Sequence, residues 1–431
     1  MTKLARLPFV LVVIAAVLAT VAPPAAASDD TYSARQWALR RVGAEKAWSA
    51  GRGGGAVIAV IDSGVDLRHE DLKGGFVKGR DFVDDDNDPS DELGHGTHVA
   101  GIAAARANNG IGVAGVAPAS KIMPLRVLDR SGSGRNGDVD AAIRWAVDHG
   151  ADVINLSLSD GATILNLFGG PLSSALNYAF SKNVVPVIVT GNDASFRTEL
   201  RSANALFVTA TGPDDRIAPY ANSVGFAKWG IAAPGGTDED GKASMVYSTI
   251  WDSKGRTHYG WGMGTSMAAP HVAGAAAVLR GLGLTAQQTV QRLMSTAKDL
   301  GAAGYDRTYG AGRLDLAAAV RGLKRGSSSA ATATLSPSIE PTASGDATDA
   351  PAADRRSDVA RTAAPTSRVT PGATASVAIA VSPRAPRVLA SDDGREPVRG
   401  TPVPALALVT SVGALGAALV SFRRARSARR S

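Results

Sequence analysis

Three side chains in this sequence have the types and the order that nucleophilic catalysis requires. Asp62 ends the apolar run AVIAVID at 56–62, His95 lies in GHGTHVAG at 94–101, and Ser266 lies in GTSMAAPHVAG at 264–274. A serine hydroxyl is a weak nucleophile at neutral pH, so it needs a nearby base and a third group that orients the base. Histidine suits the role of base because its ordinary pKa is about 6.5. The set therefore predicts acyl-transfer chemistry, with Ser266 as nucleophile, His95 as base and Asp62 as the orienting carboxylate.

The sequence around each residue predicts the local structure that its role needs. Ser266 precedes the apolar run AAPHVAGAAAVL, which predicts a buried helix that begins at the serine, with Pro270 in its first turn. The unpaired N–H groups and the dipole at a helix start favour developing negative charge. His95 also begins a helical stretch, and Asp62 directly follows a strand.

Apolar runs rich in β-branched residues alternate with helical patterns between residues 28 and 322. The expected strands are 56–61, 121–127, 153–158, 184–190 and 205–211, and the expected helices are 97–106, 138–149, 172–181, 266–282 and 285–297. This alternation predicts an α/β fold with a mainly parallel sheet and helices on both faces. Ligands of such sheets bind beyond the carboxyl ends of the strands, where Asp62 is expected to lie.

The rest of the 431 residues predicts export and anchoring. Residues 1–27 have the basic start, the apolar stretch and the small residues of a secretory signal peptide. Residues 323–403 are rich in Ala, Ser, Thr and Pro without any aromatic residue, which predicts a disordered stalk. Residues 404–422 carry no charge and are long enough to span a bilayer, and residues 423–431 form a basic cytoplasmic tail. We therefore expect a single-pass protein of the cell membrane with an extracellular domain at 28–322, as in a Gram-positive bacterium.

The formal net charge of +7 does not indicate a nucleic-acid partner. Basic residues without acidic neighbours at 1–6 and 423–431 account for this excess, so the chain between them is close to neutral. The sequence contains no cysteine, which excludes disulfides and thiol catalysis. We expect a monomer that acts on polypeptides and binds no nucleic acid.

With these motifs in this order, the chain resembles the subtilisin-like serine proteases, peptidase family S8. The segment at 29–48 and the acidic loop at 81–95 are similar to the thermitase-like branch of that family. The resemblance implies the subtilisin-like three-layer fold and hydrolysis of peptide bonds through an acyl-enzyme. It also implies that Asn192, in the turn after the apolar run at 184–190, and the Ser266 N–H stabilise the oxyanion.

The resemblance further implies how substrates bind. Family members add the substrate as an extra strand through its backbone hydrogen bonds. Two binding segments of small residues are implied, one consisting of Ser131, Gly132, Ser133 and Gly134 and the other of Ser157, Leu158 and Ser159.

Two structural calcium sites are also implied by the resemblance. One uses the side chains of Asp30, Asp71 and Asn109 with the backbone carbonyls of Arg106, Ile111 and Val113, and the other uses Asp81, Asp84, Asp86 and Asp88. Carboxylate and carbonyl oxygens are the ligands that Ca²⁺ prefers. From the residues alone, the acidic loop is equally compatible with a solvated surface loop, and it lacks the glycine and the glutamate of an EF-hand.

Two other functions fit the sequence. The signal peptide, the domain, the Pro-containing stalk and the anchor are also similar to the mycosins, which are processing proteases of secretion systems. Mycosins usually carry disulfides, which a chain without cysteine cannot form. A relative that keeps the fold without catalysis would be a surface binding module.

Overall fold

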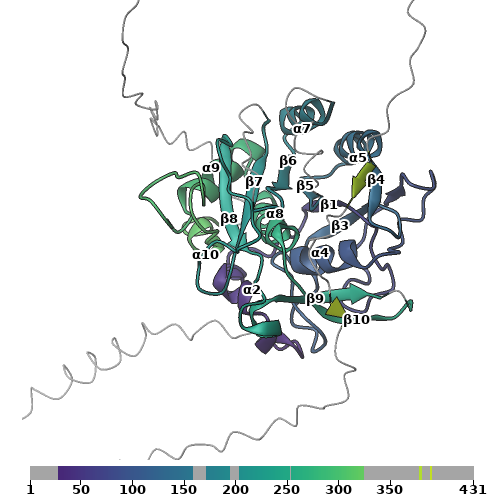
Figure 1. Cartoon of the computed structure of the whole chain (residues 1–431), viewed down its shortest axis with the longest axis horizontal. Helices are drawn as coiled ribbons and strands as arrows, with labels where there is room; N and C mark the ends of the chain where they lie inside the picture. The colour runs from purple at the N-terminus through teal and green to yellow at the C-terminus, as the bar shows by residue number, and fades with distance from the viewer. Residues whose placement is uncertain are drawn as a thin grey trace, which may run out of the picture. The chain divides into compact units, whose positions relative to one another are not determined.

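The computed structural model describes residues 28–158, 171–194, 203–252 and 254–324, together with two short strands at 378–380 and 389–390 (Figure 1). All of these residues belong to one compact unit, 1–391. The predicted signal peptide, transmembrane segment and basic tail, and most of the predicted stalk, lie outside the described residues. Within the described part of the chain, no helix is long and apolar enough to cross a membrane.

A seven-stranded sheet forms the centre of the domain. Its strands, in spatial order, are β2 (Arg80–Asp81), β3 (Lys121–Arg126), β1 (Val57–Asp62), β5 (Val153–Leu156), β6 (Val185–Val189), β7 (Leu206–Thr211) and β8 (Trp229–Pro234). Every neighbouring pair is parallel, which confirms the predicted α/β class. Five of these strands match the expected ones to within a few residues.

Helices cover both faces of this sheet, as Figure 1 shows. The helices α4 (His95–Ala104), α8 (Thr265–Gly281) and α9 (Ala286–Ser295) pack on one face, and α5 (Asn136–Asp148) and α7 (Pro171–Ser181) pack on the other. Ile58 and Val60 of β1 join the first core, whereas Ala59 and Ile61 join the second. This division follows because successive side chains of a strand point to opposite faces. The three predicted layers are therefore present.

The strand order reverses at β1. From β1 the chain continues to β3 on one side and later reaches β5 on the other side. In an open α/β sheet, such a reversal opens a crevice at the carboxyl ends of the strands. Asp62 is the last residue of β1 and lies at that point.

Several elements were not expected from the sequence. β8 reads WGIAAP, whose Gly, Pro and alanines do not have the composition of a strand, although all six residues are buried. The other unexpected elements are the two-residue strand β2 (Arg80–Asp81), the hairpin of β9 (Val246–Trp251) and β10 (Thr257–Gly262), the strand β4 (Ser133–Arg135), the short helices η1 (Ser33–Arg35), α2 (Trp37–Arg41), α3 (Ala44–Ala47), η2 (Gly241–Ser244) and α10 (Leu316–Ala319), and two strands within the predicted stalk. Most of these elements are too short for a period to be recognised.

The two strands within the predicted stalk pair with the domain. β11 (Ala378–Ala380) is antiparallel to β4, and β12 (Leu389–Ala390) is antiparallel to β10. The structure therefore describes two short strands within the segment 323–403, for which the sequence predicts a disordered stalk. Both have short apolar sequences, VAIAV at 377–381 and VLA at 388–390, which suit a strand.

Candidate active site

The fold brings Asp62 and His95 together. Asp62 is fully buried at the end of β1, and its Oδ1 lies 2.7 Å from His95 Nδ1. His95 is the first residue of α4, and Gly94 before it has a φ of 94°. A Cβ atom on Gly94 would meet the Trp251 carbonyl oxygen at 2.1 Å, so only glycine fits there. Among the described residues, His95 Nε2 has no hydrogen-bond partner, which leaves it available to a substrate or a nucleophile.

Ser266 lies in the first turn of α8 and is linked to Ser157 in both directions. Ser266 Oγ donates to the Ser157 carbonyl oxygen at 3.1 Å, and Ser157 Oγ donates to the Ser266 carbonyl oxygen at 3.0 Å. The second bond depends on Pro270, which has no N–H to donate to the Ser266 carbonyl, its normal helical partner. The sequence predicted Pro270 in the first turn of this helix. That prediction is wrong, because α8 begins at Thr265 and Pro270 lies inside the helix.

Asn192 follows β6 and faces the start of α8. Its Oδ1 accepts hydrogen bonds from the Thr265 backbone N–H and from Thr265 Oγ1, both at 2.9 Å. These two bonds fix the orientation of the amide, so its Nδ2 group is the one left to donate elsewhere. The structure thus places the predicted oxyanion donor beside the residue that precedes Ser266.

The buried carboxylate of Asp91, which is not among the predicted site residues, holds together the segments that carry Asp62 and His95. Asp91 accepts hydrogen bonds from Ser63 Oγ at 2.9 Å, from Gly94 N–H at 2.8 Å and from Thr97 N–H at 2.9 Å. Ser63 follows Asp62, whereas Gly94 and Thr97 flank His95. Asp91 therefore fixes the start of α4 against the end of β1. Its sequence signal, one aspartate among several in an acidic loop, was too weak to find it.

His95 differs from His98 and His271 in the direction in which its pKa is shifted. Burial lowers the pKa of His95, but the charge and hydrogen bond of Asp62, with the charge of Asp91, raise it above the ordinary value. Burial, and then the charge of His95, lower the pKa of His98 to about 3. Burial lowers the pKa of His271 to about 4. His98 in α4 and His271 in α8 therefore stay neutral at ordinary pH.

The predicted substrate-binding segments lie beside these residues. Ser133 and Gly134 are part of β4, whose edge meets Leu128, and both Val127 and Leu128 donate their N–H groups to the Asp62 carbonyl oxygen. A Cβ atom on Gly134 would meet the Val127 carbonyl oxygen at 2.3 Å, which explains the glycine. Ser131 and Gly132 form the turn before β4, held by the Asp129 carboxylate. Ser157 and Leu158 are buried near Ser266, and Ser159 lies outside the described residues.

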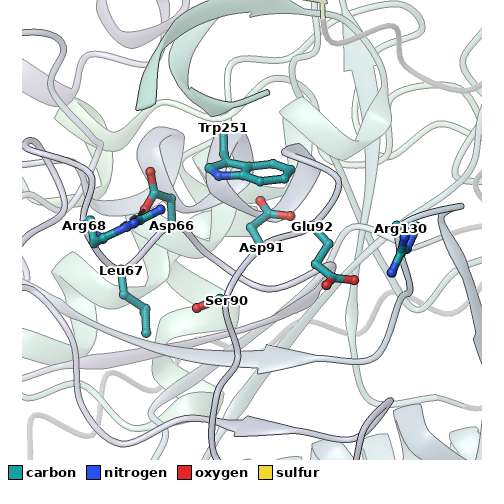
Figure 2. A pocket seen from close by; sticks show the side chains of 8 residues that line it. All are labelled: Asp66, Leu67, Arg68, Ser90, Asp91, Glu92, Arg130 and Trp251. Carbon is teal, nitrogen blue, oxygen red and sulfur yellow. Dashed lines mark hydrogen bonds and ion pairs between the residues drawn. The ribbon is translucent and has the colours of Figure 1, made fainter. Parts of the chain in front are cut away.

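A groove of about 810 Å³ adjoins this site, and the sequence did not indicate it (Figure 2). Its lining combines acidic and basic side chains with one aromatic ring and consists of Asp66, Leu67, Arg68, Ser90, Asp91, Glu92, Arg130 and Trp251. These residues come from the loop after β1, the loop before α4, the loop before β4 and the end of β9. The groove therefore connects the β4 side of the site with the β9–β10 hairpin.

Most residues of the first predicted calcium site come together. Asp30 accepts hydrogen bonds from the N–H groups of Asn108 and Asn109, both at 3.0 Å, and Asp71 accepts from Asn109 Nδ2 at 2.8 Å and from Val113 N–H at 2.7 Å. Burial raises the pKa of Asp71 to about 6, and the charge of Asp30 adds to this. Two neighbouring carboxylates that repel each other, and whose hydrogen-bond donors are all neutral, suit a hard cation.

This first site is not a cluster of three carboxylates. No group of three or more His, Asp or Glu side chains in the described residues is arranged to hold a metal ion. Calcium ligands also include amide and backbone carbonyl oxygens, which the loop of Arg106, Asn109, Ile111 and Val113 could supply. The N–H of Arg106 donates to the Asp71 carbonyl oxygen, so this loop is attached to Asp71 at both ends.

The acidic loop is organised around an arginine. Arg126 Nη1 donates to Asp81 at 2.5 Å and to Asp84 at 2.6 Å, and Arg126 Nη2 donates to Glu92 at 2.6 Å. Asp86 and Asp88 accept hydrogen bonds from N–H groups of their own loop. The guanidinium group already supplies positive charge where Asp81 and Asp84 meet. These two carboxylates therefore fit a calcium ion less well than Asp30 and Asp71 do.

Comparison with known proteins agrees with this geometry. The model of the subtilase family, Peptidase S8, matches residues 53–312. Thermitase of Thermoactinomyces vulgaris is 40% identical over 301 residues, covering 68% of this chain and 99% of thermitase. A thermophilic serine proteinase of Bacillus sp. strain AK1 is 40% identical over 286 residues, covering 66% of this chain and 67% of the relative. The solved protease of Pseudoalteromonas arctica PAMC 21717 aligns with a TM-score of 0.60 at 31% identity, covering 68% of this chain and 99% of that structure.

The parallel sheet with helices on both faces and the proteases named above define the class of the chain, a serine hydrolase with an α/β fold. The family match extends over more than half of the chain, and thermitase is matched over nearly its whole length. The chain belongs to the subtilase family of serine endopeptidases.

Proposed function

We propose that this chain hydrolyses peptide bonds with Ser266 as nucleophile, His95 as general base and Asp62 as the residue that orients it. The observation that carries the proposal is the 2.7 Å contact between Asp62 and His95 Nδ1, together with a buried Nε2 that has no partner in the described structure. That contact fixes the histidine tautomer with its lone pair on Nε2, which is the atom that must accept the serine proton.

The reaction follows from these positions. Ser266 Oγ turns from the Ser157 carbonyl towards His95 Nε2, gives its proton to that nitrogen and attacks the carbonyl carbon of the substrate. The Ser266 N–H at the start of α8 and Asn192 Nδ2 stabilise the negative oxygen. His95 then protonates the leaving amine. In the second half of the reaction His95 takes a proton from water, the water oxygen attacks the acyl carbon, and His95 returns the proton to Ser266 Oγ as the acid product leaves.

A serine-directed fluorophosphonate probe tests this proposal. The full chain is expected to be labelled at one residue, and the label is expected to disappear in Ser266→Ala while the circular dichroism spectrum stays the same. Ser244→Ala, which removes a buried hydroxyl in η2 outside the candidate site, serves as the matched control and is expected to retain labelling. A folded chain that is not labelled would contradict the enzyme assignment and would favour the surface binding module.

Replacing Asn192 with alanine is expected to lower kcat by about 10²–10³, a magnitude measured for the corresponding asparagine of subtilisin. KM is expected to change little, because the amide acts on the oxyanion and not on the bound peptide. Thr265→Val, which removes one of the two hydrogen bonds to Asn192, is expected to cost only about three- to tenfold. Steady-state kinetics on a peptide amide measure both effects. Equal losses of kcat in the two variants would assign Asn192 a structural role.

We also propose that calcium stabilises the domain at Asp30, Asp71 and Asn109. When bound, the ion would neutralise two neighbouring carboxylates and hold the loop at 106–113 to the N-terminal segment. At the acidic loop, Arg126 supports a different arrangement, in which the guanidinium group and not a metal ion balances Asp81 and Asp84.

Removal of calcium by a chelator is expected to lower Tm by about 5–10 °C, as for an ion present at about 100 times its Kd. Asp71→Asn is expected to abolish this difference, because it removes a carboxylate ligand. Asp84→Asn is the control, and its difference between calcium and chelator is expected to equal that of the wild type. Differential scanning calorimetry measures Tm for the wild type and both variants, each with calcium and with chelator. A chelator effect that Asp84→Asn removes and Asp71→Asn keeps would place the ion at the acidic loop instead.

The predicted signal peptide and the apolar segment at 404–422 support a secreted enzyme held at the cell membrane. Fractionation of expressing cells, with protease applied from outside, tests this topology. A mycosin-like processing role shares this arrangement. Cleavage of a single exported protein, with no cleavage of casein, would favour it.

A further inference from the structure

The chain carries its own strand at the edge where an extended substrate is proposed to bind. One edge of β4 faces the Leu128 loop, with a bridge between Leu128 and Gly134. β11 pairs along β4 with Ile379 opposite Gly134 and Ala380 opposite Ser133. Gly134 thus has a partner on each side, one from the domain and one from the tail. A strand edge with unpaired N–H and C=O groups is a template for adding another strand, which is how proteases of this fold hold peptides.

A second attachment lies on the other flank of the site. Leu389 and Ala390 of β12 pair with Trp261 and Gly260 of β10. β10 ends at Gly262, shortly before Ser266, and the Gly260 carbonyl oxygen contacts His98 Nε2 of α4 at 3.3 Å. Figure 1 shows the two yellow strands beside β4 and β10, with α4 between them in this view.

These two attachments bracket the proposed catalytic residues. The β4 side is tied to Asp62 through the N–H groups of Val127 and Leu128, and the β10 side leads directly into Ser266. The groove in Figure 2 extends between the same two sides, because Arg130 precedes β4 and Trp251 ends β9, the partner strand of β10. A chain that pairs at both places therefore competes for the surface that a substrate would use.

We propose that residues 378–380 bind the substrate-binding edge of their own chain at β4, that residues 389–390 attach the same tail to β10, and that the tail acts as an intramolecular competitor of peptide substrates. This inference rests on the proposed function, and on the family resemblance for the assignment of residues 131–134, which include the start of β4, as a substrate-binding segment. Because both strands belong to the same polypeptide, their binding does not depend on protein concentration. The sequence between them, VSPRAPRV, contains two prolines, whose nitrogens cannot donate the hydrogen bonds of an extended substrate. This composition favours a segment that binds over one that is cut.

Strand pairing is tested first, in a form that needs no activity. The chain has no cysteine, so Ser133→Cys combined with Ala380→Cys in the full chain with Ser266→Ala can form only one intramolecular disulfide. Residues directly opposite each other have Cβ atoms about 4.5–5.5 Å apart, whereas diagonal neighbours are about 7–8 Å apart. The pair is expected to oxidise at least tenfold faster than the control, Ser133→Cys with Ala378→Cys. Equal rates would overturn the proposed register.

Competition is tested by kinetics on the active full chain with a short peptide amide. Along a strand, the backbone N–H groups of successive residues point alternately towards and away from a given partner strand. Ala378→Pro combined with Ile379→Pro therefore removes one N–H that points towards β4. This variant is expected to lower KM at least threefold with kcat unchanged. Ala373→Pro with Thr374→Pro, in the same tail before β11, is the matched control and is expected to retain the wild-type KM.

Three results would overturn the competition. The first is an unchanged KM in the variant. The second is cleavage between residues 380 and 389, which would make the segment a substrate. The third is a KM difference that vanishes on hundredfold dilution, which would indicate pairing between copies. If neither the wild type nor any variant hydrolyses peptides or reacts with the fluorophosphonate probe, the proposed function is wrong and so is the proposed competition. The disulfide experiment still decides whether the strands pair.

Discussion

Ser266→Ala is expected to lower kcat by about 10⁶-fold, because no other group at this position can form the acyl-enzyme. The magnitude comes from subtilisin, a member of the same family, and not from this structure. A residual acceleration of about 10³–10⁴ over water is expected, since the Ser266 N–H and Asn192 still favour the oxyanion. Active-site titration and steady-state kinetics on a peptide amide measure the loss.

The double variant Ser266→Ala with His95→Ala provides the sharper test. A base without its nucleophile has nothing to activate, so the second substitution is expected to add almost no further loss. Ser266→Ala removes one hydrogen bond, to the Ser157 carbonyl, so Tm is expected to change by only a few degrees. Losses that multiply in the double variant would contradict a joint role for the two residues.

The positions of the candidate catalytic residues in the fold were predictable because these residues stand at element boundaries with strong sequence signals. The apolar run before Asp62 and the long alanine-rich run after Ser266 form β1 and α8, which are buried almost throughout. Parallel strands place their carboxyl ends on one edge of the sheet, so a residue that follows a strand is brought to the site by the fold itself. Asn192, which follows β6, arrives there for the same reason.

Contacts that depend on tertiary packing were not predictable. The sequence indicated Pro270 but not that its missing N–H leaves the Ser266 carbonyl free for Ser157. Arg126 lies in β3, remote in sequence from Asp81 and Asp84, and only the pairing of β2 with β3 brings them together. β8 and the β9–β10 hairpin lacked the composition or the length that sequence patterns require. β11 and β12 lie in a segment whose overall composition predicted disorder, because composition averages over short apolar stretches.

Asp62→Asn is expected to lower kcat by about 10⁴-fold and to move the acid limb of the pH profile. An asparagine keeps the shape of Asp62 but can donate to His95 Nδ1, which favours the wrong tautomer, and related serine proteases lose about this much. Burial alone lowers the pKa of His95, and two of the three influences that raise it come from Asp62. His95 is a base only when neutral, so wild-type kcat/KM is expected to fall with decreasing pH through a value above 6.5.

In Asp62→Asn that limb is expected to shift to lower pH, because the charge of Asp91 is then the main remaining influence that raises the pKa against burial. The measurement is kcat/KM against pH for both chains on the same peptide amide. Asp66→Asn is the matched control, since it removes another buried carboxylate, in the loop after β1, that is not among the groups that raise the pKa of His95, and its acid limb is expected to stay in place. A loss of rate in Asp62→Asn without a shift of the limb would mean that Asp62 only holds the ring in position. A shift without a large loss would mean that the tautomer matters less than the charge.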